Sequence, residues 1–308
     1  MRYAAALVLA ACSIAAGCGG SSSAQEEPGA STSENATTSG NGQTLEQLWR
    51  APGEDVAIVP GTADFGPGKV RFTFLVIDGQ GRVVTRPTAK VWLAKQLKAE
   101  PFAQTTAKSE PIGVNGNEPG EPQAVFVSQL DVDKPGTYWV LAEPVGGRKI
   151  QAVGNIVVKP ETTAPDVGAA VFPSETPTLD NATLKELSTS TKPDPALYRI
   201  SVADAIKAKK PFVVVFATPK YCTSRTCGPV VDVVSAVRRT HKDSGIDFIH
   251  AEIYKDNDPT KGENTWVREW KLPSEPWTFL VGSDGTVKSR FEGTVSVDEL
   301  NAAVDKLR

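Results

Sequence analysis

The sequence has few cysteines, few histidines and no excess of basic over acidic residues, and each of these features excludes a class of protein. Its 308 residues include four cysteines and two histidines, and the formal net charge is −3. Without a basic excess the chain has no electrostatic footprint for nucleic acid. Four zinc ligands at recognised spacings are also lacking, so we expect no metal or other cofactor. The length still allows two domains of ordinary size, each with its own core.

Long apolar runs are scarce as well. The run that follows Arg2 is too short to span a bilayer and is typical of a signal peptide. Small residues precede Cys12 and again Cys18, a pattern that resembles the lipobox of bacterial lipoproteins, in which the cysteine carries the lipid. Because the Gly/Ser-rich sequence begins only after Cys18, we assign residues 1–17 to a signal peptide and Cys18 to lipidation. A plain secretory signal with incidental cysteines is the alternative.

The lipobox resemblance implies a chain that is exported and lipid-anchored to the outer face of the bacterial cell membrane. Residues 18–45 have few apolar side chains to offset the entropy of ordering, which predicts a flexible tether. Removal of the leader and lipidation leave Cys222 and Cys227 as one cysteine pair. Outside the cytoplasm we expect a disulfide between them in at least one state.

Residues 46–160 consist of short alternating runs separated by turn residues, which predicts β-strands without a long helix. Five runs carry this pattern: KVRFTFLVID, AKVWLAKQ, AVFVSQL, GTYWVLAEP and AVGNIVVKP. Such strands favour an antiparallel sandwich. The turn before Tyr138 resembles the tyrosine corner of immunoglobulin-like domains, and we expect Trp92 in the core of such a sandwich. This part has no catalytic cluster, so we expect a spacer or a module that binds a protein partner.

The pattern changes after residues 161–180, which are rich in proline and threonine and predict a linker. From 181 to 308, strands alternate with helices: PFVVVFA is typical of a strand buried on both faces, and Ser201 and Ser296 occupy helix N-cap positions. Ser283-Asp284-Gly285 predicts a hairpin turn. The order predicts a mixed α/β sheet with helices on its faces.

The two cysteines follow the buried strand, where a helix is expected to start. This arrangement, with Pro276 before the hairpin and a closing helix, resembles the thioredoxin superfamily over roughly residues 181–308. The resemblance implies thiol–disulfide exchange in which Cys222 is the nucleophile and Cys227 the resolving thiol. It also implies that Pro276 takes the place of the family's cis-proline and that the backbone of Glu275 pairs with an extended substrate.

The spacing of the cysteines departs from the thioredoxin pattern. Within one helix, residues five apart have Cα atoms about 8.6 Å apart, beyond the reach of a disulfide. Either Cys222 lies in a loop before the helix, or oxidation unwinds the first turn. Gly228-Pro229 favours the loop, because proline is well tolerated at a helix start. A longer helix kinked at Pro229 is the competing placement.

A second departure is the lack of an acid in the strand VVVFATP, where thioredoxin carries a buried carboxyl group. Glu252 and Asp256, after the next strand, are the candidate substitutes, and simple solvent exposure is the alternative for both.

Three other functions fit parts of the sequence. The loop ATPKYCTSRTCG is similar to the Cys-x4-Cys loop of Q-type peroxiredoxins, but Pro219 stands where their motif needs threonine. A Sco-type copper site needs a distal histidine, and we expect His241 on the surface and His250 within a strand. A structural disulfide in a non-enzymatic scaffold lipoprotein is the third, although so short a loop constrains the unfolded chain little. We therefore predict a membrane-anchored extracytoplasmic thiol–disulfide oxidoreductase that acts on protein or small-molecule thiols.

Overall fold

The computed structural model describes residues 42–307 except 54, 116–121, 147–150 and 223–225. Cys18, the predicted signal peptide and most of the predicted tether lie outside the described residues. In the described part, no helix is both long and apolar enough to cross a membrane.

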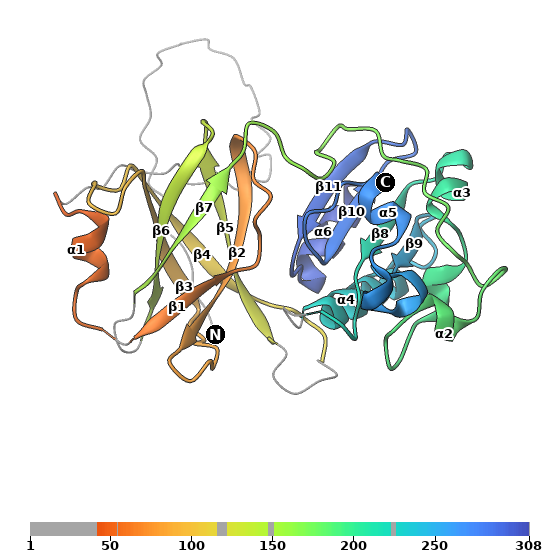
Figure 1. The fold of residues 1–308 in the computed structure, drawn as a ribbon, viewed down its shortest axis with the longest axis horizontal. Coiled ribbons are helices and arrows are strands. Elements are labelled where there is room, and N and C mark those ends of the chain that lie inside the picture. The colour runs from red at the N-terminus through yellow and green to blue at the C-terminus, as the bar shows by residue number, and fades with distance from the viewer. Residues whose placement is uncertain (1–41, 54, 116–121, 147–150, 223–225, 308) are drawn as a thin grey trace, which may run out of the picture. The chain divides into compact units, whose positions relative to one another are not determined.

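The N-terminal part is a short helix followed by seven antiparallel strands (Figure 1). Helix α1 (Leu45–Trp49) begins with a capping box between Thr44 and Gln47. The strands form one sheet in the order β1-β2-β5-β4-β3-β6-β7. Their bounds are β1 Val56–Pro60, β2 Gly68–Asp78, β3 Thr88–Ala94, β4 Ala103–Pro111, β5 Ala124–Val132, β6 Gly136–Val145 and β7 Ala152–Val158.

This sheet curls until it is a nearly closed barrel. Its two edge strands approach so closely that a Cβ atom on Gly154 of β7 would lie 2.6 Å from Cγ2 of Ile58 in β1. Inside, Phe72, Phe74 and Phe126 stack with ring centroids 5.1 and 5.2 Å apart. The expected two-sheet immunoglobulin-like layout is not confirmed, because all seven strands pair into one sheet.

The two aromatic residues singled out in this part have different surroundings. The hydroxyl of Tyr138 donates to the carbonyl oxygen of Lys134 at 2.7 Å, the local contact expected of a tyrosine corner. Trp92 is buried, but it packs with Leu45 and Leu141 beside α1, apart from the aromatic interior. Strand alternation explains this, because the neighbours of Trp92 in β3 face the interior.

The C-terminal part is a four-stranded mixed sheet in the order β11-β10-β8-β9. Strands β8 (Phe212–Phe216) and β9 (Asp247–Ala251) are parallel, and β10 (Trp277–Val281) and β11 (Val287–Glu292) form the predicted hairpin. The helical segments are α2 (Leu184–Leu187), η1 (Pro195–Tyr198), α3 (Val202–Lys207), α4 (Cys227–Thr240), η2 (Lys255–Asn257), η3 (Pro259–Lys261), α5 (Thr265–Glu269) and α6 (Val297–Asp305).

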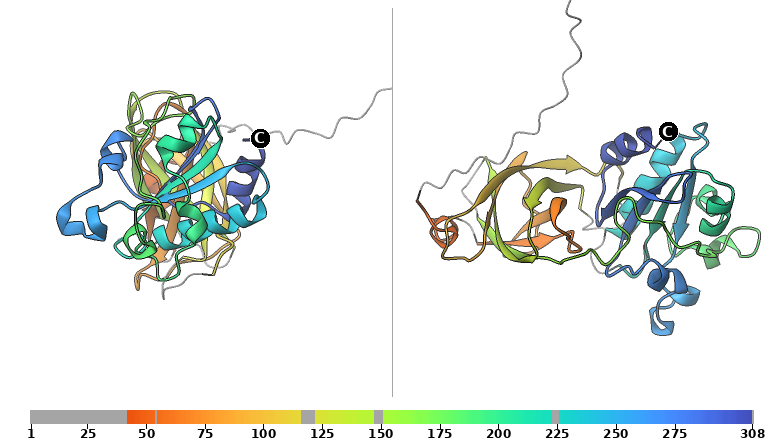
Figure 2. Two further views of the ribbon diagram at one scale, coloured as in Figure 1. Left: turned by 90° about the vertical axis from the view of Figure 1, so that its right-hand side faces the viewer. Right: turned by 90° about the horizontal axis from the view of Figure 1, so that it is seen from above.

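Helices cover both faces of this sheet, as Figure 2 shows. Val213 and Val215 of β8 share a core with residues of α4 and α6, whereas Phe212, Val214 and Phe216 pack with residues of α3 and α5. Every residue of β8 is buried, which explains its continuous apolar sequence. The mixed α/β sheet predicted for residues 181–308 is therefore observed.

Residues 161–180 contain no helix and no extended strand. Their backbone nevertheless pairs with the hairpin: Gly168 donates to Val287, whose own amide donates to Ala169, and Val171 donates to Gly285. This stretch therefore pairs with the outer edge of the hairpin at the turn and at the first residue of β11.

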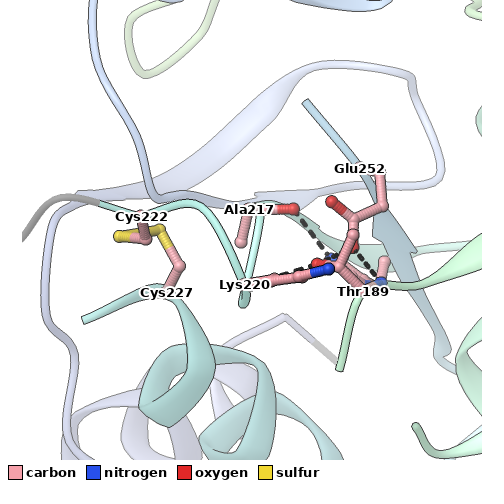
Figure 3. The surroundings of a disulfide bond; sticks show 7 residues. Thr189, Ala217, Lys220, Cys222, Cys227 and Glu252 are labelled. Carbon is pink, nitrogen blue, oxygen red and sulfur yellow. Dashed lines mark hydrogen bonds between the residues drawn. A yellow bond between two sulfur atoms is a disulfide. The ribbon is translucent and has the colours of Figure 1, made fainter. Parts of the chain in front are cut away.

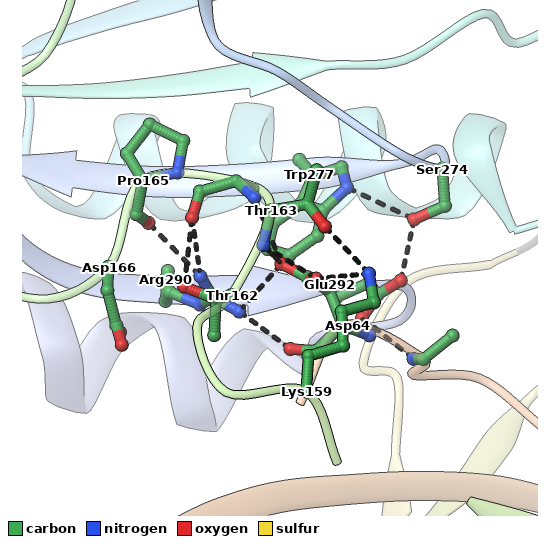
Figure 4. A network of polar contacts seen from close by, with 12 residues as sticks. Asp64, Lys159, Thr162, Thr163, Pro165, Asp166, Ser274, Trp277, Arg290 and Glu292 are labelled. Atoms are coloured by element: carbon green, nitrogen blue, oxygen red, sulfur yellow. Dashed lines mark hydrogen bonds and ion pairs between the residues drawn. The ribbon is translucent and has the colours of Figure 1, made fainter. Parts of the chain in front are cut away.

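A buried polar cluster joins the loop before β2 to residues 159–164 and to β11 (Figure 4). The side chain of Asp64 is fully buried, and its carboxylate accepts hydrogen bonds from the backbone of Thr163 and Ala164 at 2.8–3.0 Å. Lys159 lies 3.0 Å from Asp64 Oδ1, and Arg290 lies 3.3 Å from Oδ2. We call these five residues the Asp64 cluster.

Glu292, at the end of β11, also contacts the loop before β2, and we call this contact region together with the Asp64 cluster the junction. Its Oε2 accepts from the backbone N–H groups of Ala63 and Asp64 at 2.8 and 2.7 Å. Its Oε1 accepts from the hydroxyl of Ser274 at 2.6 Å. Both carboxylates of the junction are therefore surrounded by donors, which is the condition for burying such a group.

Candidate functional site

Cys222 and Cys227 form a disulfide at the start of α4 (Figure 3). Helix α4 begins at Cys227, so Cys222 lies in the loop before it, and the two Cα atoms are 5.9 Å apart. Of the two options left by the spacing, the structure thus has the first, in which Cys222 lies in a loop before the helix. Pro229 lies in the first turn, where its missing N–H needs no partner.

The two cysteines differ in their exposure to solvent. Cys227 is fully buried, whereas Cys222 is partly buried. Cys222 is therefore the more accessible residue of the pair. Cys227 lies at the N-terminus of a 14-residue helix, whose unpaired N–H groups and dipole favour a thiolate when the disulfide opens.

The segment before Cys222 is attached to the body of the domain through Glu252. Its Oε1 accepts from the backbone amide and the hydroxyl of Thr189 at 2.6 and 2.8 Å. The same hydroxyl accepts from the amide of Lys220 at 3.1 Å (Figure 3). Glu252, one of two candidate acids, is thus a buried anchor for this loop. The other, Asp256, is exposed and paired with Lys261 at 2.9 Å.

The loop before β10 brings Glu275 and Pro276 to the disulfide. The peptide bond between them is cis, as the thioredoxin resemblance implies. A carboxylate oxygen of Glu275 and both cysteine sulfurs lie within 4.8 Å of one another. Burial, followed by the charges of Glu252 and Glu263, raises the pKa of Glu275 to about 7.

The sequence pointed to the backbone of Glu275 and missed its side chain. The available signal was an acidic residue directly before the predicted cis-proline, in a domain whose central strand has no acid. What the sequence did not reveal is the distance between this carboxyl group and the sulfurs, because about fifty residues separate them along the chain.

Cys222, Cys227 and Glu275 are also the one group of three metal-ligating side chains found within the described residues. In the disulfide form the two sulfurs are bonded to each other and offer no thiolate. Three donors also fall short of the four that a closed zinc site needs. We therefore do not assign these residues as metal ligands.

Neither histidine joins this group. His250 is buried, and its ring nitrogens contact the hydroxyl of Tyr198 at 2.6 Å and the carbonyl oxygen of Ala217 at 3.0 Å. Burial lowers the pKa of His250, so the ring is neutral. His241, expected on the surface, is instead buried at the end of α4, where its Nε2 lies 3.0 Å from Asn301 Oδ1.

A cavity of about 310 Å³ lies away from the disulfide. Its lining includes Asp64, Arg71 and Arg290 but no cysteine. Thiol exchange with a protein substrate needs an accessible sulfur rather than a deep cavity, so we place the candidate site at the disulfide.

Comparisons with known proteins give similarity to solved structures alone. No protein-family model and no curated protein sequence matches the chain. Among solved structures, a thiol:disulfide interchange protein of the thioredoxin family from Chlorobium tepidum TLS is similar, with 16% identity and a TM-score of 0.30. The match covers 39% of this chain and 99% of that one. At such identity and score it assigns no role to any residue here.

Proposed function

We propose that this chain is a thiol–disulfide oxidoreductase that acts through Cys222 and Cys227. The observation that carries the proposal is the disulfide at the start of α4, in which Cys222 is the more accessible residue and Cys227 is buried. Thiol–disulfide exchange proceeds by attack of a thiolate on one sulfur and departure of the other. Cys222 is then the sulfur that forms the mixed disulfide, and Cys227 resolves it.

The proposed substrates are protein or small-molecule thiols and disulfides outside the cytoplasm. The backbone of Glu275 and the ring of Pro276 are the proposed contacts for an extended substrate, supported by the closeness of Glu275 to both sulfurs. The N-terminal barrel is proposed as a spacer or a protein-binding module.

The test is a comparison of two single variants in glutathione redox buffers. With a disulfide-bonded cysteine peptide, the Cys222 thiolate of Cys227→Ser should attack one peptide sulfur, release the other as a thiolate and accumulate a mixed disulfide, and Cys222→Ser should accumulate far less. Mass spectrometry measures both. If neither variant traps the peptide and the wild-type disulfide resists reduction, the bond is structural and the scaffold alternative holds. Turnover of hydrogen peroxide would assign the peroxidase activity instead.

Export and anchoring are a separate proposal that rests on the sequence around Cys18. Intact-mass analysis of the mature protein should show a diacylated or triacylated N-terminal cysteine at position 18. Cys18→Ala should abolish the lipid mass, whereas Cys12→Ala should leave it unchanged. A lipid that persists in Cys18→Ala and disappears in Cys12→Ala would move the cleavage site.

A further inference from the structure

Glu275 places a carboxyl group beside the disulfide without the donors that such a group normally needs. One of its oxygens lies within 4.8 Å of both cysteine sulfurs. Its Oε2 is buried, and none of the described residues donates a hydrogen bond to it. Burying a polar atom without a partner destabilises the folded state, so the position of this group calls for a cause other than stability.

The charges around Glu275 keep its proton exchangeable near neutral pH. Among the described residues, the titratable groups that face it are the two cysteines, Glu252 from the end of β9, Glu263 before α5, and Tyr254. None of these is a cation. Burial and the two carboxylates disfavour the charged form of Glu275, which raises its pKa to about 7. Burial, then Glu275 and Glu263, raises the pKa of the Tyr254 phenol, which stays protonated.

Thiol–disulfide exchange needs a group that moves protons, because a thiolate leaves and a second thiol must ionise. The strand β8 supplies no acid, since its five residues are phenylalanine and valine. Oε1 of Glu252 accepts from Thr189 whereas its Oε2 has no donor among the described residues, and Asp256 is exposed and paired with Lys261. Of the acids considered, Glu275 alone has a carboxyl oxygen close to both sulfurs.

We infer that the side chain of Glu275 is the proton donor and acceptor of the Cys222–Cys227 pair. This inference rests on the proposed function and adds a catalytic residue to it. It assigns to the side chain a role separate from the substrate contact proposed for the backbone of the same residue.

The substrate in this exchange is a dithiol, which is oxidised to a disulfide. A substrate thiolate attacks Cys222 Sγ, the bond between the two protein sulfurs breaks, and Cys227 leaves as a thiolate that takes the proton of Glu275. The Glu275 carboxylate then takes the proton of the second substrate thiol. That thiolate attacks the substrate sulfur of the mixed disulfide, and Cys222 leaves as a thiolate. Two electrons pass from the dithiol to the protein, and Glu275 ends protonated, as it began.

The test is the pH dependence of reduction of the full chain by dithiothreitol, followed by ultraviolet absorbance of the thiolate. In the wild-type protein the rate, corrected for the thiolate fraction of dithiothreitol, should change with an inflection near the pKa of Glu275, about 7. Glu275→Gln should lose that inflection and slow the reaction on the order of 10²-fold.

Glu263→Gln is the matched control, because it removes an exposed carboxylate that acts on Glu275 only through its charge. It should keep the wild-type rate and move the inflection slightly to lower pH. Thermal unfolding checks that each variant is folded.

The two proposals fail in different ways. If wild-type protein exchanges thiols and Cys227→Ser traps a mixed disulfide through Cys222, but Glu275→Gln keeps both rate and inflection, the inference about Glu275 is overturned and the oxidoreductase stands. If the wild-type disulfide is not reduced and no mixed disulfide forms, the oxidoreductase itself is overturned, and the role of Glu275 with it.

Discussion

The carboxyl group of Asp64, next to β11, is fully buried and that of Glu275, beside the disulfide, is partly buried, and the two differ in the donors around them. Asp64 accepts from two backbone amides and lies next to Lys159 and Arg290. Burial alone would raise its pKa, but these hydrogen bonds and charges lower the pKa overall. Glu275 has carboxylates as neighbours and an oxygen without a donor, and its pKa is raised.

The comparison separates a carboxylate that stabilises the fold from one that is available for chemistry. A charged group with several donors is fixed in one protonation state at neutral pH. A carboxyl group without donors changes its protonation near neutral pH at the expense of stability. The following variants test this contrast through the free energy of unfolding.

Asp64→Asn should have the largest effect, a loss of about 3–5 kcal/mol in the free energy of unfolding. The amide loses the buried negative charge beside Lys159 and Arg290, and its NH2 group cannot accept where a carboxylate oxygen did. Urea unfolding measures the loss. Since the folded-state pKa of Asp64 is below its ordinary value, its contribution is present above that ordinary value and is lost as pH falls through the folded-state pKa. A loss that is the same at low and neutral pH would contradict the assignment.

Glu292→Gln should cost less, about 1–2 kcal/mol. The amide keeps the shape and one acceptor oxygen for the N–H groups of Ala63 and Asp64, but it loses the charge that strengthens both bonds. Urea unfolding of this variant beside Asp64→Asn ranks the two carboxylates of the junction. A larger loss than that of Asp64→Asn would reverse this ranking.

Glu275→Gln should increase the free energy of unfolding, by on the order of 1–2 kcal/mol at pH 8 once partial solvent exposure is allowed for. The folded-state pKa, about 7, lies above the ordinary value of 4.5. The folded protein therefore holds this proton more tightly between these values, and stability falls as pH rises through them. The variant should lose that slope. A destabilised variant would show that the carboxylate has a partner after all.

Asp284→Asn should have the smallest effect and serves as the control. Hydrogen bonds from Lys288 and Thr286 lower the pKa of Asp284 to about 2, but the group is fully exposed. Exposed pairs contribute little because water screens them. The urea midpoint should be unchanged within error, and a clear shift would show that a lowered pKa by itself predicts stability in this protein.

Much of the C-terminal fold could be predicted because its signals are local. The N-caps at Ser201 and Ser296, the apolar strand β8 and the turn between β10 and β11 each depend on a few consecutive residues, and all are observed. The arrangement of the N-terminal strands could not be predicted in the same way. Whether seven strands make two sheets or one depends on pairing between distant segments, such as the approach of β1 to β7.

Two strands of the barrel were missed for an identifiable reason. Strand β4 has the polar sequence AQTTAKSEP, and only Ala107 in it is fully buried, so it lacks a clear apolar alternation. Strand β1, VAIVP, has no fully buried residue. Neither strand shows the alternation of apolar and polar residues by which the other five strands were predicted.

At the candidate site, the spacing of the cysteines excluded a disulfide within one regular helix, and Gly228-Pro229 favoured the observed position of Cys222 in a loop before α4 over a longer, kinked helix. The lack of a hydrogen-bond donor for Glu275 Oε2 among the described residues did not follow from the sequence. Whether a side chain has a donor depends on every segment that packs around it, and Glu252 and Glu263 come from other parts of the chain.

The pairing of Gly168, Ala169 and Val171 with the hairpin has a consequence for solubility. An uncovered edge strand is a template on which another chain can add a strand and begin to aggregate. By pairing with Val287, the first residue of β11, this stretch occupies the outer edge where the strand begins, so that another copy of the chain cannot add a strand at that point.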